Sequence, residues 1–141
     1  MHRRLFWIIL ISLIILGPLA FDWLTAQAQV DRVKFDYTLS PARVVADGKS
    51  STTLILRVTQ DGQPRANDML QIWFEVGGGM VTPDTAFTDS NGQITITYRP
   101  NPANAYDPTD FTQIAIMDAS IGRLIEVRKQ ESIKIPLVMP Q

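Results

Sequence analysis

Apolar and polar residues alternate along most of the chain after residue 30. In residues 70–76 every second side chain is apolar: Leu70, Ile72, Phe74 and Val76. Because a strand places successive side chains on opposite faces, these four residues are predicted to face a core. Trp73 is then predicted to point outward, between Gln71 and Glu75.

The same two-residue period recurs in further segments, at 33–39, 54–58, 92–99, 111–119, 124–128 and 132–138, and around Pro83. Turn signals separate them, the strongest being Asp89-Ser90-Asn91-Gly92. No segment after Ala28 keeps a helical period beyond two turns. Many short strands at this spacing predict an all-β fold, an Ig-like antiparallel β-sandwich of about 7–9 strands.

Residues 1–28 differ from the rest and have the order of features found in a secretory signal. Arg3 and Arg4 precede a long apolar run, Leu5–Leu16, which only Ser12 interrupts. The run is followed by Ala26-Gln27-Ala28, an A-x-A pattern that signal peptidase accepts. We therefore expect cleavage after Ala28, leaving residues 29–141 as the folded domain.

The alternative is an uncleaved signal anchor, in which residues 5–21 remain as a transmembrane helix. A stretch of this length lies at the short limit for crossing a bilayer. In both cases Arg3 and Arg4 are expected to stay on the cytoplasmic side. The sandwich is then extracytoplasmic: secreted, periplasmic, at the cell surface, or membrane-anchored with the domain outside.

Composition excludes several classes of function. The chain has no cysteine, and its single histidine, His2, lies in the signal segment. The domain therefore lacks the residues of Ser-His-Asp triads, Cys-His dyads and the usual zinc sites. Without Arg3, Arg4 and Asp22, the 13 basic and 14 acidic residues become 11 and 13. This near balance argues against a nucleic-acid partner.

Six short motifs follow one another in order: Ser40-Pro41, Ala46-Asp47-Gly48, Thr53-Leu54, Gln60-Asp61-Gly62-Gln63-Pro64, Ile72–Phe74 and Thr88-Asp89-Ser90-Asn91-Gly92. In this order, the stretch from Ser40 to Tyr98 resembles a single copy of the bacterial Ig-like domain of invasin- and intimin-type adhesins (Big-1-like repeat). A transthyretin-like module shares the two turn motifs, and the Ala46-Asp47-Gly48 lead-in favours the Ig-like repeat.

The resemblance implies an Ig-like sandwich without enzymatic activity. The expected function is that of an exported module of the bacterial envelope or surface, acting through protein or surface contacts in adhesion or as a structural accessory. The alternative is a membrane-anchored accessory subunit of a larger envelope complex, with residues 5–21 retained. The partner is a protein or cell-surface component that the sequence does not identify.

The candidate contact surface rests on an Ig-like arrangement in which 70–76 pairs with 92–99, and 92–99 with 111–119. This pairing would gather the following outward residues: Gln71, Trp73, Glu75, Thr97, Arg99 and Met117. The proline-rich loop 100–110 adds Tyr106 as a further candidate. The competing interpretations are that the tail, Ser132–Val138, or the first strand covers this face, that Trp73 packs on the Arg99 stem, and that Tyr106 packs on the core.

Two pairs of aspartates are the candidates for acid–base or metal-binding groups. Asp61 and Asp68 lie near turns, as do Asp107 and Asp110. Turn aspartates are ordinarily solvated, and no cleft is indicated for either pair. The sequence therefore predicts no catalytic residue, no metal site and no cofactor.

Overall fold

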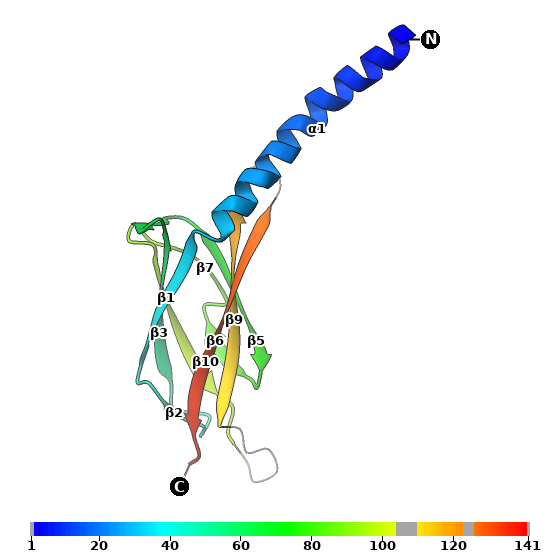
Figure 1. Ribbon diagram of the computed structural model, residues 1–141. Helices are drawn as coiled ribbons and strands as arrows, with labels where there is room; N and C mark the ends of the chain where they lie inside the picture. The colour runs from blue at the N-terminus through cyan, green and yellow to red at the C-terminus, as the bar shows by residue number, and fades with distance from the viewer. Residues whose placement is uncertain (1, 104–109, 123–125, 141) are drawn as a thin grey trace.

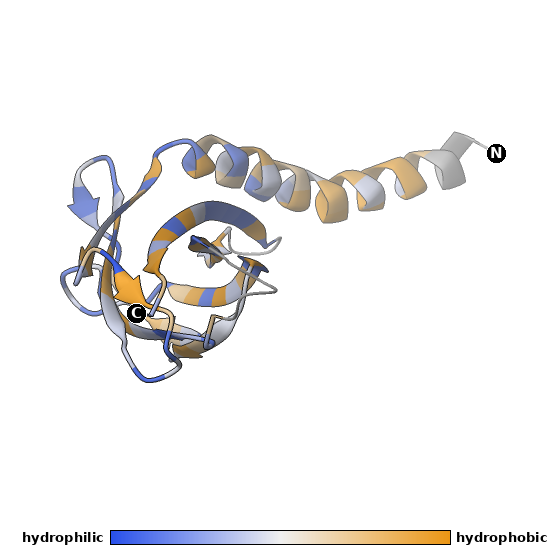
Figure 2. Ribbon diagram, turned by 90° about the horizontal axis from the view of Figure 1, so that it is seen from below, coloured by the Kyte–Doolittle hydropathy of each residue, from blue (hydrophilic) through white to orange (hydrophobic). Residues whose placement is uncertain are grey.

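The structure, a computed structural model, describes residues 2–103, 110–122 and 126–140. Within these ranges one helix, α1 (His2–Val30), precedes ten strands that form two packed sheets. Figure 1 shows α1 projecting from one end of the sandwich, with the C-terminal strand ending at the other. In Figure 2 the helix is mostly hydrophobic along its outer part and more hydrophilic where it meets the sandwich.

Each sheet has five strands. Sheet 1 runs in the order β1 (Val33–Ser40), β3 (Thr52–Gln60), β8 (Gln93–Pro100) and β6 (Gly79–Thr82), with β4 (Gln63–Pro64) paired to β3. Sheet 2 runs in the order β2 (Val44–Val45), β10 (Val127–Val138), β9 (Phe111–Ile121), β5 (Met69–Val76) and β7 (Thr85–Phe87). Among the strands that the structure describes, only β2 and β10 pair in parallel. The predicted all-β sandwich is confirmed.

The core consists of the inward rows that the alternation predicted. Ten of these side chains are at most 5% exposed: Leu54, Leu56, Val58, Ile94, Ile96, Tyr98, Ile114, Ile116, Ile133 and Ile135. Val76 is an exception at 42% exposed. The register of β5 against β9 shifts between Phe74 and Val76, and this irregularity ends the inward row one position early.

Strand pairing differs from the expectation in one important respect. β5 pairs with β9 in sheet 2, whereas β8 lies in sheet 1 between β3 and β6. The predictions that 70–76 pairs with 92–99 and that 92–99 pairs with 111–119 were both wrong, because alternation defines the face of a strand and not its neighbour. The chain therefore crosses from sheet 1 to sheet 2 between β8 and β9.

The tail also lies differently from one of the proposed arrangements. The predicted segment 132–138 and residues 127–128 of the predicted segment 124–128 belong to one strand, β10, which is antiparallel to β9 along most of its length. Residues 124 and 125 lie outside the described residues. The tail therefore extends sheet 2 sideways and does not cover its outer face. Residues 132–138 pair within the domain: Ser132 lies opposite Ala115, and Ile135 lies opposite Thr112.

The Asp89–Gly92 turn has the geometry that its sequence indicates. The Gly92 amide donates to the Asp89 carbonyl at 2.9 Å, and the Asn91 amide donates to Asp89 Oδ1 at 2.8 Å. Gly92 has a φ of 70°, and a Cβ at this position would lie 2.5 Å from the Val58 carbonyl oxygen. Glycine is thus required both by the turn and by the close approach of β3.

Candidate functional site

The outer face of sheet 2 carries Trp73 in a row of small neighbours. Trp73 lies opposite Ala115 on β9, and Ala115 lies opposite Ser132 on β10. Trp73 is 37% exposed, while Ala115 is fully buried. Trp73 therefore belongs to the outer surface, as predicted, and part of it is exposed to solvent.

A fixed carboxylate lies beside this row. Glu75 accepts hydrogen bonds from Gln113 Nε2 at 2.7 Å, Gln130 Nε2 at 2.8 Å and Ser132 Oγ at 2.7 Å. These bonds, those from Ser132 and Gln113 above all, lower the pKa of the Glu75 carboxyl. The side chains of three neighbouring strands are thus held in one orientation around a negative charge that persists at neutral pH.

The next row is more closed than the sequence suggested. Met117 lies between Gln71 on β5 and Gln130 on β10, and it is only 7% exposed. A central strand has neighbours on both sides, so longer side chains beside it can cover its outward residues. Met117 was expected to be accessible near the middle of the face, but it is almost completely covered.

The structure divides the predicted contact surface. Gln71, Trp73, Glu75 and Met117 lie on sheet 2, whereas Thr97 and Arg99 lie on β8 in sheet 1. Arg99 donates to Met80 Sδ at 3.6 Å, whereas Glu75 accepts hydrogen bonds from residues of sheet 2. Trp73 is not packed on the Arg99 stem. Tyr106 lies outside the described residues.

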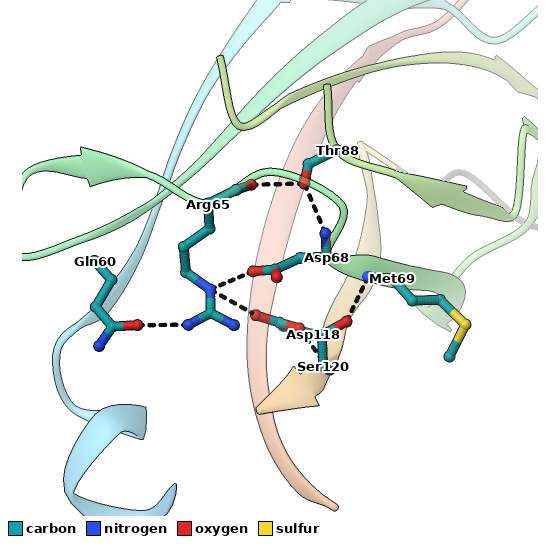
Figure 3. Close-up of polar contacts among 7 residues, drawn as sticks. All are labelled: Gln60, Arg65, Asp68, Met69, Thr88, Asp118 and Ser120. Carbon is teal, nitrogen blue, oxygen red and sulfur yellow. Dashed lines mark hydrogen bonds and ion pairs between the residues drawn. The ribbon is translucent and has the colours of Figure 1, made fainter. Parts of the chain in front are cut away.

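A second polar constellation, which sequence reasoning missed, lies inside the sandwich near the end that carries α1. Figure 3 shows Arg65 pointing toward two carboxylates, Asp68 and Asp118. Asp118 is fully buried, and Asp68 is 7% exposed. Arg65 Nε forms a close ion pair with Asp68 Oδ2 and lies 3.7 Å from Asp118 Oδ2.

Other groups fix this cluster in place. The Asp68 amide donates to Thr88 Oγ1 at 2.9 Å, and the Thr88 hydroxyl donates to the Arg65 carbonyl at 2.6 Å. On the other side, the Ser120 amide donates to Asp118 Oδ1 at 2.8 Å. Arg65 also reaches Gln60 on β3, so the cluster connects sheet 1 with sheet 2.

The two carboxylates and one guanidinium leave the cluster with one uncompensated negative charge when both acids are ionised. Asp118 Oδ2 has no hydrogen-bond partner among the described residues. Burial, opposed in part by the Ser120 amide and by Arg65, raises the pKa of Asp118 to about 6. The negative charge of Asp68 acts in the same direction as burial.

The interpretation of Asp68 as a solvated turn residue was therefore wrong. The second carboxylate near Asp68 is that of Asp118, which is distant in sequence. Asp61 is exposed and instead pairs with Arg32 at 3.3 Å. A signal was present, because Asp118 has the same two-residue parity as Ile114 and Ile116 and so falls on the inward face of its strand. No sequence pattern placed Arg65 beside it.

The last turns of α1 are packed on this same end of the sandwich. Ala26 is 1% exposed and belongs to the hydrophobic core, against which Val30 also packs. A groove between helix and sandwich is lined by Thr25 and Gln29 on one side and by Ser120 and Gly122 on the other. Within the described residues, α1 alone is long and apolar enough to cross a membrane, over Phe6–Val30.

The described residues contain no group of three or more His, Cys, Asp or Glu side chains that could hold a metal ion. The outer face of sheet 2 can offer an aromatic surface with ordered amides and one carboxylate. The Arg65 cluster is largely buried and consists of one cation between two carboxylates.

Comparison with solved structures agrees with the fold. The D00–D0 domain of intimin matches with a TM-score of 0.54 and 18% identity, covering 73% of this chain and 46% of that chain. A C-terminal fragment of intimin, in complex with the intimin-binding domain of the translocated intimin receptor, matches with a TM-score of 0.52 and 14% identity. That match covers 74% of this chain and 32% of that chain.

This chain therefore corresponds to less than half the length of these intimin structures. No protein-family model matches the sequence. No curated protein matches it either. Taken with the motifs between Ser40 and Tyr98, the structural likeness shows that the domain has the Ig-like fold of the intimin type.

Proposed function

We propose that this chain is an exported, non-enzymatic Ig-like module of a bacterial envelope, which stays attached to the membrane through α1 and acts by contact with a protein or surface partner. The observation that carries this proposal is the continuity of the apolar helix with the core of the sandwich. Ala26 is 1% exposed, and it lies in the same helix as the candidate span.

The burial of Ala26 favours retention of the helix over its removal. Cleavage after Ala28 would take Ala26 out of the core and leave Val30 without the helical turn before it. Apolar contacts of this kind favour the packed state, because the buried surface would otherwise be returned to water. The sandwich then lies outside the cytoplasm, with its α1 end nearest the membrane.

A released domain is the second candidate, and the Ala26-Gln27-Ala28 pattern favours it. In that form residues 29–141 are secreted or periplasmic, and contact with a partner is their whole function. The anchored and released forms differ by residues 1–28, so their intact masses distinguish them.

The outer face of sheet 2 is the proposed contact surface, with Gln71, Trp73 and Glu75 as its accessible residues. Tryptophan is enriched among residues that dominate binding energy, and rigid neighbours reduce the entropy lost on binding. Glu75 is such a neighbour, because three donors hold its carboxylate. Thr97 and Arg99 lie on sheet 1 and are not part of the proposed surface, and Tyr106 lies outside the described residues.

The proposed surface is tested by photo-crosslinking in cells that express the full chain. A photoreactive residue at Gln71 is expected to capture a partner protein, while the same residue at Thr97, on the outer face of sheet 1, is expected to capture none. Adding Trp73→Ala should weaken capture from Gln71 by about tenfold or more. Because Trp73 is part of the surface, its loss should lower the free energy of unfolding by only about 1 kcal/mol.

Equal capture from Gln71 and Thr97 would contradict the assignment of the surface to sheet 2. Capture that is unaffected by Trp73→Ala would remove Trp73 from it. If Trp73→Ala instead unfolds the domain, the indole is a core residue and the exposed face loses its main contact group.

A further inference from the structure

The Arg65 cluster lies at the junction of three parts of the fold. Arg65 and Asp68 come from the connection between sheet 1 and sheet 2, and Asp118 comes from the middle strand of sheet 2. Two residues beyond Asp118, Ser120 lines the groove against α1. A change in the charge of Asp118 is therefore expected to affect both the contact between the two sheets and the groove in which α1 packs on the sandwich.

Asp118 has too few donors to be stable as an anion in this position. Its Oδ1 accepts a hydrogen bond from the Ser120 amide, whereas Oδ2 has no hydrogen-bond partner among the described residues and lies 3.7 Å from Arg65 Nε. The side chain is fully buried. A buried anion without enough donors is strongly unfavourable, and the common response is to take up a proton. A protonated Asp118 can donate a hydrogen bond to the Asp68 carboxylate beside it. The pair then carries one negative charge, which balances the charge of Arg65.

Apart from Arg65, the charged groups that the structure describes on the surrounding elements do not compensate an ionised Asp118. On β10, Lys129 lies opposite Asp118 in register, but it forms no ion pair with Asp118. On β5 the opposite residue is the neutral Leu70. The helix contributes Asp22 to the groove, which is negative and so cannot compensate an ionised Asp118.

We propose that Asp68 and Asp118 are a proton-binding pair that fastens the α1 end of the sandwich when it holds one proton and loosens that end when the proton is released. With the proton bound, Arg65 pairs with a single shared negative charge and the two sheets are drawn together. Without it, two buried anions share one guanidinium and repel each other. The device operates whether α1 is retained or removed, so it does not depend on the proposed function.

The direction of the pH effect follows from the geometry. The folded state holds the proton of Asp118 more tightly than the unfolded chain does. This difference in proton affinity stabilises the fold fully at pH values below about 4, the ordinary pKa of an aspartate. That stabilisation is lost as the pH rises through about 6, the pKa of Asp118 in the fold. Glu75, whose pKa is lowered, acts in the opposite direction and at lower pH.

The first test is a carboxyl ¹³C NMR titration of the full-length chain in detergent micelles. The Asp118 carboxyl carbon is expected to titrate near pH 6, about two pH units above an exposed aspartate. Amide exchange at Ser120 and Met69, corrected for the intrinsic rate, should become faster above this pH. An Asp118 midpoint at or below pH 4.5 would overturn the proposal, whether or not any variant folds.

The second test compares Asp118→Asn with a matched exposed control, Asp84→Asn. Between pH 5 and pH 7.5 the Tm of the wild-type chain should fall by on the order of 5 to 10 °C. The fall should be retained in the Asp84→Asn chain and absent in the Asp118→Asn chain, whose Tm at pH 7.5 should exceed that of the wild type. The same slope in all three chains would contradict the proton-binding pair.

Discussion

Replacing Arg65 with methionine is expected to lower the free energy of unfolding by about 3 to 5 kcal/mol at pH 7. The guanidinium is the cation that pairs with the buried Asp68 and Asp118. Methionine preserves much of the volume but supplies no charge, so both carboxylates would remain buried without a counterion. Denaturant unfolding of the full-length chain, followed by circular dichroism, measures the loss.

Arg128→Met is the matched control for this substitution. Arg128 forms an ion pair with Glu126 at 2.7 Å, but both side chains are about half exposed. An exposed pair of this kind contributes about 0 to 1 kcal/mol, so its loss should be small. In the Arg65→Met background, Asp118→Asn should restore part of the stability, because it removes one of the two buried charges. A loss from Arg65→Met no larger than that from Arg128→Met would show that the cluster is not held by charge.

The second large effect is expected at Tyr98, which connects the sheets at the end away from α1. Its ring is fully buried, and its hydroxyl donates to the Gly78 carbonyl at 3.0 Å and lies 2.7 Å from Thr112 Oγ1. Burial raises the pKa of the phenol, so it stays protonated at neutral pH. Tyr98→Ala should lower the free energy of unfolding by about 3 to 5 kcal/mol, as for other large buried side chains.

Tyr98→Phe separates the two contributions of this residue, because it keeps the ring and removes only the hydroxyl. It leaves the Thr112 hydroxyl and the Gly78 carbonyl without their shared partner, at an expected loss of about 1 to 2 kcal/mol. Equilibrium unfolding of both variants under the same conditions gives the comparison. If Tyr98→Phe were as damaging as Tyr98→Ala, the hydroxyl and not the ring would be the main contribution.

The faces of the strands could be predicted from the sequence, but their neighbours could not. Alternation assigned Leu54, Ile96 and Ile114 to the core, and all three are fully buried. Alternation is a property of one strand, whereas pairing depends on contacts between segments far apart in the sequence. For this reason β8 was assigned to the wrong sheet, and Thr97 and Arg99 were separated from Trp73.

For the candidate site, too, the sequence predicted the face on which a residue lies but not the residues that surround it. Trp73 was correctly placed on an outer face, because its parity opposes that of its apolar neighbours. The Arg65 cluster was missed because Arg65, Asp68 and Asp118 meet only once both sheets are assembled. An aspartate at an inward position of a strand is a usable signal, but it indicates burial without identifying the cation that accompanies it.

The intact mass of the native protein, recovered from fractionated cells, tests the central claim most directly. We predict that the native chain retains residues 5–28, is recovered in the membrane fraction and resists alkaline carbonate extraction. A chain that begins at Gln29 and is recovered in the soluble extracytoplasmic fraction would contradict retention of α1 as the anchor.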